Sequence, residues 1–136
     1  SLGDDMSHIT SDPNPHMPLY TKSISEAVTS GKVSVILFAT PAFCRTATCG
    51  PQVKTIARLE KKMGDSVNFL HVEIYDNPHK ILGDITNAEV SPEVRKWNLP
   101  SEPWTFVVDS KGIVSNRFEG FATEGEIKEA ISALTR

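Results

Sequence analysis

The stretch that decides the fold is VSVILFATPAFCRTATCGPQ, residues 33–52, which also contains both cysteines of the chain. It opens with an apolar run rich in β-branched residues, 33–38, directly after the turn signal Gly31-Lys32. A run of this length and composition is typical of a strand that is covered on both faces of a sheet. We therefore predict a central strand here.

An amphipathic helix is predicted after the strand, because apolar residues recur at helical spacing over residues 53–59. Proline is tolerated only in the first turn of a helix, so Pro51 predicts a helix start near residues 48–51. Cys49 then lies at the helix N-terminus and Cys44 in the loop before it. Free N–H groups and the positive end of the helix dipole favour a thiolate, so Cys49 is predisposed to react.

The order of strand, FAT, cysteine, CGP and amphipathic helix resembles the active-site region of thioredoxin-like proteins. Thioredoxins carry Cys-Gly-Pro-Cys, whereas Cys49-Gly50-Pro51 is followed here by Gln52. The resemblance therefore implies an atypical redox pair, Cys44 with Cys49, at Cys-x-x-x-x-Cys spacing. The sequence does not settle which cysteine attacks the substrate disulfide. Cys44 is slightly favoured, because it lies in the more exposed loop.

The first half of the chain supplies further elements of this fold. Residues 1–20 lack periodicity and are predicted to form a mostly extended arm, with an edge strand around residues 17–20 as an option. Ser23 and Glu26 have capping-box spacing at the start of a short helix. The run 67–74 is rich in strand-forming residues and follows the main helix. Strand, helix and strand in this order predict a right-handed parallel crossover.

The second half completes a mixed sheet. Residues 75–90 are turn-rich and are interpreted as a surface insertion with a short hairpin about residues 81–85. A helix is predicted from Ser91-Pro92, with Val94 and Trp97 buried. The last predicted elements are a strand at 104–109, a turn at 109–112, a strand at 113–119 and a helix capped by Thr123. The resemblance thus covers residues 21–136 and implies an α/β, three-layer thioredoxin-like domain, with a central mixed β-sheet flanked by helices.

A second signature of the resemblance is Glu102-Pro103-Trp104 before the strand. Thioredoxin-like proteins place a proline, normally cis, at this point and facing the cysteines. The resemblance implies that Pro103 belongs to the active site, that the Glu102 backbone turns toward a substrate chain, and that Trp104 lines a partner-binding groove. A loop proline and a core tryptophan are the structural alternatives.

His71 and Glu73 are candidates for a proton relay beneath the cysteines. They lie two residues apart in the predicted strand and therefore share a face. The buried aspartate that thioredoxins carry on the preceding strand is absent, since that strand offers only Ser34. A hydrogen-bonded core histidine is the alternative for His71. Arg45 would lower the pKa of a Cys44 thiol if its guanidinium reached the sulfur.

Composition and charge exclude several classes of function. With 136 residues, 39% hydrophobic and 23% charged, the chain is expected to form one globular domain. A formal net charge of −3 gives no electrostatic case for binding nucleic acid. No run of about 20 apolar residues is present, so we expect no membrane insertion of this segment. An extracytoplasmic setting, with a signal or anchor removed, remains open.

The leading hypothesis is a thiol–disulfide oxidoreductase that exchanges a Cys44–Cys49 disulfide with the thiols and disulfides of protein substrates. The resemblance implies no bound cofactor, and we expect a monomer. A structural bridge or two unreactive thiols are the alternatives for the cysteines. The four histidines show no metal-ligand spacing, so no metal is expected.

Two other classes stay open. Thr40-Pro41 ahead of the two cysteines is similar to the site of peroxiredoxin-like thiol peroxidases, although the threonine lies one residue too far upstream of Cys44. A non-catalytic thioredoxin-fold binding module would use the groove near Pro103 instead.

Overall fold

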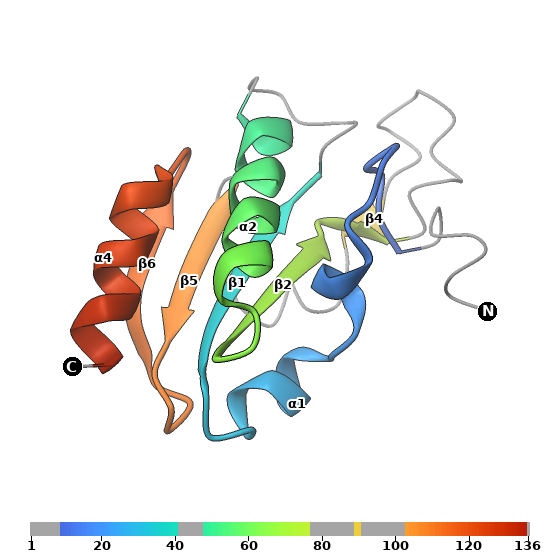
Figure 1. The fold of residues 1–136 in the computed structure, drawn as a ribbon. Coiled ribbons are helices and arrows are strands. Elements are labelled where there is room, and N and C mark those ends of the chain that lie inside the picture. Colours follow the sequence, from blue (N-terminus) through green and yellow to red (C-terminus); the bar gives the residue numbers. More distant parts are fainter. Residues whose placement is uncertain (1–8, 41–47, 77–88, 91–102, 136) are drawn as a thin grey trace.

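The structure is a computed structural model, and it describes residues 9–40, 48–76, 89–90 and 103–135 (Figure 1). Its elements are, in chain order, the 3-10 helix η1 (Met17–Tyr20), α1 (Ile24–Val28), β1 (Val33–Ala39), α2 (Cys49–Met63), β2 (Val67–Glu73), β3 (Tyr75–Asp76), β4 (Glu89–Val90), β5 (Trp104–Val108), β6 (Val114–Glu119) and α4 (Glu124–Thr135).

The main sheet has the strand order β2-β1-β5-β6 (Figure 1). Strand β1 pairs with β2 in parallel and with β5 antiparallel, and β5 pairs with β6 antiparallel. Every residue of β1 is buried, as its apolar run predicts. The central strand, the parallel crossover through α2 and the mixed sheet flanked by helices are therefore confirmed.

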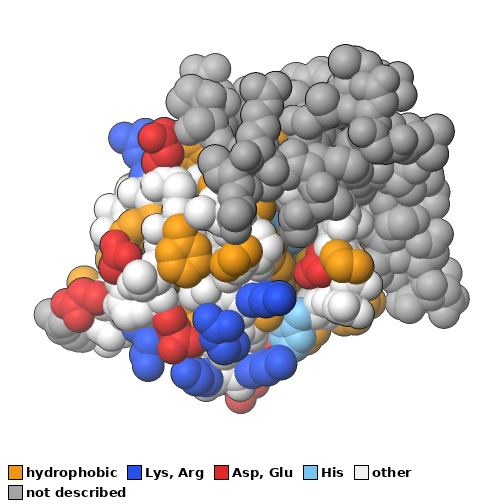
Figure 2. Space-filling model, turned by 90° about the horizontal axis from the view of Figure 1, so that it is seen from above, with side chains coloured by type: hydrophobic (Ala, Val, Ile, Leu, Met, Phe, Trp, Pro, Cys, Tyr) orange, Lys and Arg blue, Asp and Glu red, His pale blue; other side chains and the backbone are white. Residues whose placement is uncertain are grey.

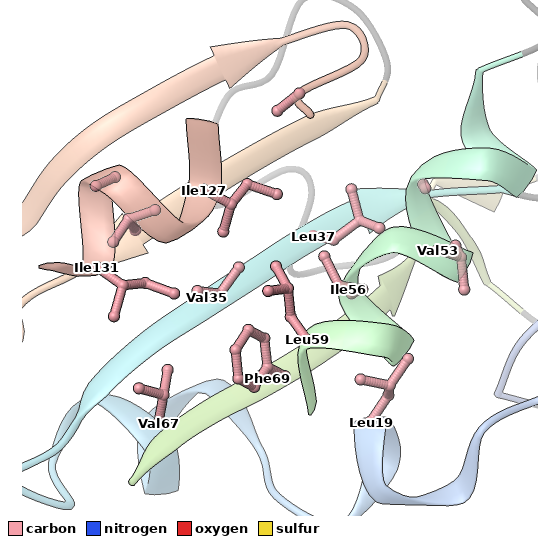
Figure 3. Packing of buried hydrophobic residues seen from close by; sticks show 14 of the residues in the cluster. Leu19, Val35, Leu37, Val53, Ile56, Leu59, Val67, Phe69, Ile127 and Ile131 are labelled. Atoms are coloured by element: carbon pink, nitrogen blue, oxygen red, sulfur yellow. The ribbon is translucent and has the colours of Figure 1, made fainter. Parts of the chain in front are cut away.

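Alternation along the strands divides the core between the two faces of the sheet. Val35 and Leu37 of β1 point toward α2 and α4, which lie on the same face (Figures 1 and 3). Ile36 and Phe38 belong to a second cluster on the other face, where Ala27 of α1 packs. Both faces are thus covered, and α2 is held with its first residue, Cys49, inside the first cluster.

Local sequence signals set several boundaries. The Ser23 hydroxyl accepts the Glu26 N–H at 3.1 Å, and the Glu26 carboxylate accepts the Ser23 N–H at 3.0 Å, so the predicted capping box is present. Thr123 and Glu126 form the same pair of bonds at the start of α4. Gly112 has φ +84° in the turn between β5 and β6, a conformation that suits glycine.

The predicted edge strand at residues 17–20 is wrong, because this segment forms η1. Pro18 lies in the first turn, where its missing N–H costs nothing, and the Leu19 N–H donates to the His16 carbonyl at 3.0 Å. Leu19 is buried in the cluster beneath α2. His16 Nε2 lies 2.6 Å from Glu60 Oε1, which ties the arm to α2.

The ends of the predicted insertion pair with each other, since β3 and β4 form a small antiparallel sheet that the sequence did not predict. The hairpin about residues 81–85 and the helix from Ser91 lie outside the described residues. Cys44, Arg45 and Glu102 also lie outside them.

Candidate functional site

Cys49 is the first residue of α2, as predicted. The Gln52 N–H donates to the Thr48 carbonyl at 2.9 Å, which closes the first turn of the helix around it. The Cys49 side chain is fully buried, and its sulfur takes part in a disulfide.

Gln52 occupies the position at which thioredoxins carry their second cysteine, and its side chain has a structural role. The Nε2 group donates to the Ala122 carbonyl at 3.0 Å, and Oε1 accepts the Ala122 N–H at 2.6 Å. Both residues are fully buried. This reciprocal pair fixes the first turn of α2 to the connection between β6 and α4. The sequence shows that the second cysteine is missing but gives no signal for this role of Gln52, because Ala122 lies 70 positions away.

Pro103 lies buried immediately before β5, where the sequence places it. Its carbonyl accepts the Gly120 N–H at 2.9 Å, so the start of β5 is held against the end of β6. Gly120 has φ +76°, which suits a glycine in this tight connection. The next residue, Phe121, is 44% exposed and was not singled out from the sequence.

Trp104 is partly buried and stacks on Phe106, with 5.9 Å between ring centroids and an interplanar angle of 14°. This places the indole on the sheet face that α1 helps to cover. Among the described residues, its Nε1–H is buried and makes no hydrogen bond. A groove-lining role for Trp104 stays a prediction, while its contribution to the core is evident.

His71 is buried in β2 and forms two short hydrogen bonds. Its Nε2 lies 2.8 Å from the Ala39 carbonyl, and its Nδ1 lies 2.7 Å from the Tyr20 hydroxyl. Burial lowers the pKa of His71 below its ordinary value, outweighing the opposing effects of the Ala39 bond and of the Glu73 charge. Burial likewise raises the pKa of Tyr20. Both groups are therefore neutral near pH 7.

Glu73 is buried in β2 two residues after His71, so the two side chains lie on the same face of the strand. Its Oε1 accepts the Ser11 N–H at 2.7 Å, and its Oε2 accepts the Ile74 N–H at 3.0 Å. The carboxylate thus binds the N-terminal arm at the end of the strand. Its role in a proton relay stays a prediction.

A pH dependence of stability follows from the burial of His71. As the pH falls below about 6.5, the unfolded chain binds a proton at this histidine before the folded chain does, so the free energy of unfolding decreases. One proton corresponds to at most about 1.4 kcal/mol per pH unit. Urea unfolding at about pH 7.5 and about pH 5.5 should show that the free energy of unfolding decreases more in the wild type than in His71→Gln. Equal losses would contradict a neutral, buried His71.

The end of the molecule at which α2 begins carries exposed hydrophobic side chains, and Lys and Arg side chains gather on its α2 side (Figure 2). The exposed cations of α2 are Lys54, Arg58, Lys61 and Lys62. Glu124 of α4 pairs with Lys62 at 3.3 Å and with Arg58 at 3.7 Å.

No helix in the described part of the chain is long and apolar enough to cross a membrane. Within those same ranges, no three His, Cys, Asp or Glu side chains lie together as a metal site requires.

Comparisons with known proteins place the fold. No protein-family model and no curated protein sequence matches the chain. Among solved structures, it is similar to a thioredoxin-family thiol:disulfide interchange protein from Chlorobium tepidum TLS, with TM-score 0.63 and 15% identity over 82% of this chain and 85% of that one.

Two further solved structures are similar at the same identity. A putative thiol:disulfide interchange protein DsbE from Chlorobium tepidum has TM-score 0.65 at 15% identity, covering 95% of this chain and 98% of that one. A thiol-disulfide isomerase from Corynebacterium glutamicum has TM-score 0.63 at 15% identity, covering 85% and 88%. At this identity the similarity establishes the fold that the chain shares with these proteins.

Proposed function

Starting from a chain with the thioredoxin fold, we propose that it is a thiol–disulfide oxidoreductase in which Cys44 and Cys49 exchange a disulfide with protein substrates. The observation that carries the proposal is the placement of Cys49, disulfide-bonded, at the first residue of α2. Cys44 is the other cysteine in the sequence, and we assign it as the partner.

The exchange runs in two steps that balance. The thiolate of one cysteine attacks a substrate disulfide, forms a mixed disulfide and releases one substrate thiolate. The second cysteine then attacks the mixed disulfide, which releases the other substrate thiolate and leaves the Cys44–Cys49 disulfide. Two electrons pass to the substrate, and water protonates the released thiolates. We assign the first attack to Cys44, because the fully buried Cys49 is inaccessible to a large substrate.

The substrate surface in this proposal includes Pro103 and Glu102, as the resemblance implies, together with Phe121. The Trp104 indole packs on the opposite face of the sheet from Cys49 and is left out of this surface. The exposed ring of Phe121 directly follows Gly120, whose N–H is bonded to the Pro103 carbonyl. An apolar side chain at this point suits an extended substrate segment. The names of the similar proteins support protein thiols as substrates, and one of them, a putative DsbE, supports an extracytoplasmic setting, where disulfides persist.

The proposal is tested by reduction of insulin disulfides with dithiothreitol, comparing the rate with and without the protein. We expect a clear acceleration by the wild type. No acceleration, together with formation of sulfenic acid in hydrogen peroxide, would favour the peroxidase instead. If the protein shows neither activity, the non-catalytic binding module is the hypothesis that remains.

A further inference from the structure

We propose that a cavity between the N-terminal arm and α2 receives an apolar side chain of a protein substrate, and that Lys54 and Lys61 attract acidic residues beside that side chain. The inference rests on the proposed function for calling the bound polypeptide a substrate. It adds a contact surface on the side of α2 away from Phe121, because α2 lies between the arm and α4 (Figure 1).

The cavity has a volume of about 290 Å³ and lies beside the first turns of α2. Its helix wall includes Gly50, Val53, Lys54 and Ala57, and Pro13 belongs to its arm wall. Val53 is buried in the core beneath α2, and Ala57 packs against the same core. The floor of the cavity is therefore apolar, which favours an apolar occupant.

The arm wall is held in place before anything binds. The Asn14 N–H donates to the Asp12 carboxylate at 3.0 Å, which closes a tight turn in the arm. His16 Nε2 lies 2.6 Å from Glu60 Oε1, so the arm is tied to the helix that forms the opposite wall. A cavity with both walls fixed costs little conformational entropy to fill.

The size and position of the cavity suit one side chain of a polypeptide. Small-molecule sites enclose their ligands in about 300–1,000 Å³. This cavity is smaller, and it opens to solvent because Pro13, Asn14 and Lys54 at its rim are exposed. It also borders Gly50, the neighbour of Cys49, where an added Cβ would meet no atom within 4 Å. A substrate chain at the start of α2 thus has room to send a side chain into the cavity.

Lys54 and Lys61 supply positive charge on the helix side of the cavity. They are exposed, seven positions apart, and share one stripe of α2 with Ala57. Neither forms an ion pair with a residue that the structure describes, whereas the other exposed cations of α2 pair with Glu124. Figure 2 shows Lys and Arg side chains gathered on this side of the molecule.

The spacing of the two lysines defines the substrate segment more closely. Seven residues of a helix span about 10 Å, a distance that three residues of an extended chain also cover. The segment that fits has a large apolar residue between two acidic residues three positions apart. Asp12 makes the arm side of the cavity anionic, so the acidic residues are expected over the helix.

The experiment is a ¹⁵N NMR titration of the oxidised protein with the peptide Gly-Glu-Leu-Gly-Glu-Gly. We expect saturable shifts of the amide signals of Gly50, Lys54 and Ala57, because these residues line the cavity. Replacing the leucine of the peptide with glycine should weaken binding about tenfold. Replacing both glutamates with lysine should weaken it at least about threefold, and added salt should reduce this difference.

Three variants of the protein test the cavity and the charges separately. Ala57→Trp fills the cavity and should weaken binding of the leucine peptide about tenfold. Lys54→Glu should reverse the preference between the glutamate and lysine peptides. Lys128→Glu makes the same change of charge at an exposed position of α4 and should leave that preference as in the wild type.

The outcomes separate this inference from the proposed function. Absence of saturable shifts at the cavity, or the same peptide preference in Lys54→Glu as in Lys128→Glu, would overturn the inference. If the wild type still accelerates insulin reduction, the proposed function stays intact. Peptide binding without insulin reduction would contradict the proposed exchange, and with it the assignment of the bound polypeptide as a substrate.

Discussion

Replacing Cys49 with serine is expected to reduce the insulin reductase activity to the rate of dithiothreitol alone. A serine hydroxyl forms no disulfide, and the proposed exchange needs one cysteine to attack and the other to release the substrate. Cys44→Ser should cause the same complete loss for the same reason. The assay is the rate of insulin precipitation under dithiothreitol, with folding of each variant checked by circular dichroism.

The two single variants also distinguish the roles of the cysteines. If Cys44 attacks, Cys49→Ser should accumulate a mixed disulfide with a substrate, because nothing resolves it, and Cys44→Ser should not. Cys49→Ser combined with Ser132→Cys serves as a control, since it returns a thiol at an exposed position of α4. Retained turnover in Cys44→Ser would contradict the two-cysteine mechanism.

Gln52→Leu is expected to lower the free energy of unfolding by about 3 kcal/mol. Leucine has a similar size and cannot replace the bonds to the Ala122 N–H and carbonyl, so both backbone groups would remain buried without a partner. Each such group costs about 1–3 kcal/mol. Urea unfolding of the wild type and the variant under oxidising conditions measures the difference.

Lys54→Leu is the matched control for this variant. It introduces the same side chain into the same helix at an exposed position, where the effect on stability should be within about 0.5 kcal/mol. Similar changes in the free energy of unfolding of both variants would show that the Gln52 bonds do not fix α2. A larger loss of stability in Gln52→Leu is the expected outcome.

The sequence could predict the parts of the fold that depend on local patterns. The apolar run over residues 33–38 lies in β1, Pro51 lies in the first turn of α2, the Ser23 capping box starts α1, and Thr123 caps α4. Each of these signals depends on residues within one or two turns of one another. The fold class followed from their order along the chain.

Local sequence patterns could not predict the contacts between segments that lie far apart in the chain. The bonds of Gln52 to Ala122 span 70 positions, and that of Tyr20 to His71 spans 51. No local spacing indicates either pair. The same limit explains the wrong edge strand at η1, since the burial of Leu19 beneath α2 decides the conformation there.

The candidate site was predicted in part. Cys49 lies at the helix start, Pro103 lies just before β5, and His71 and Glu73 share a face, all as the sequence indicated. Their hydrogen-bond partners were not foreseen, because Ser11 and Tyr20 come from an arm that lacks periodicity. The chemistry assigned to Cys44 and Cys49 remains a proposal to be measured.

The reduction potential of the Cys44–Cys49 pair tests that chemistry most directly. The protein is equilibrated with defined thiol buffers, free thiols are trapped, and the oxidised fraction is measured at each ratio. A potential between about −270 and −120 mV, the range of known oxidoreductases, is the expected result. A potential far below about −300 mV would make the disulfide structural, and failure to form it would contradict the proposed exchange altogether.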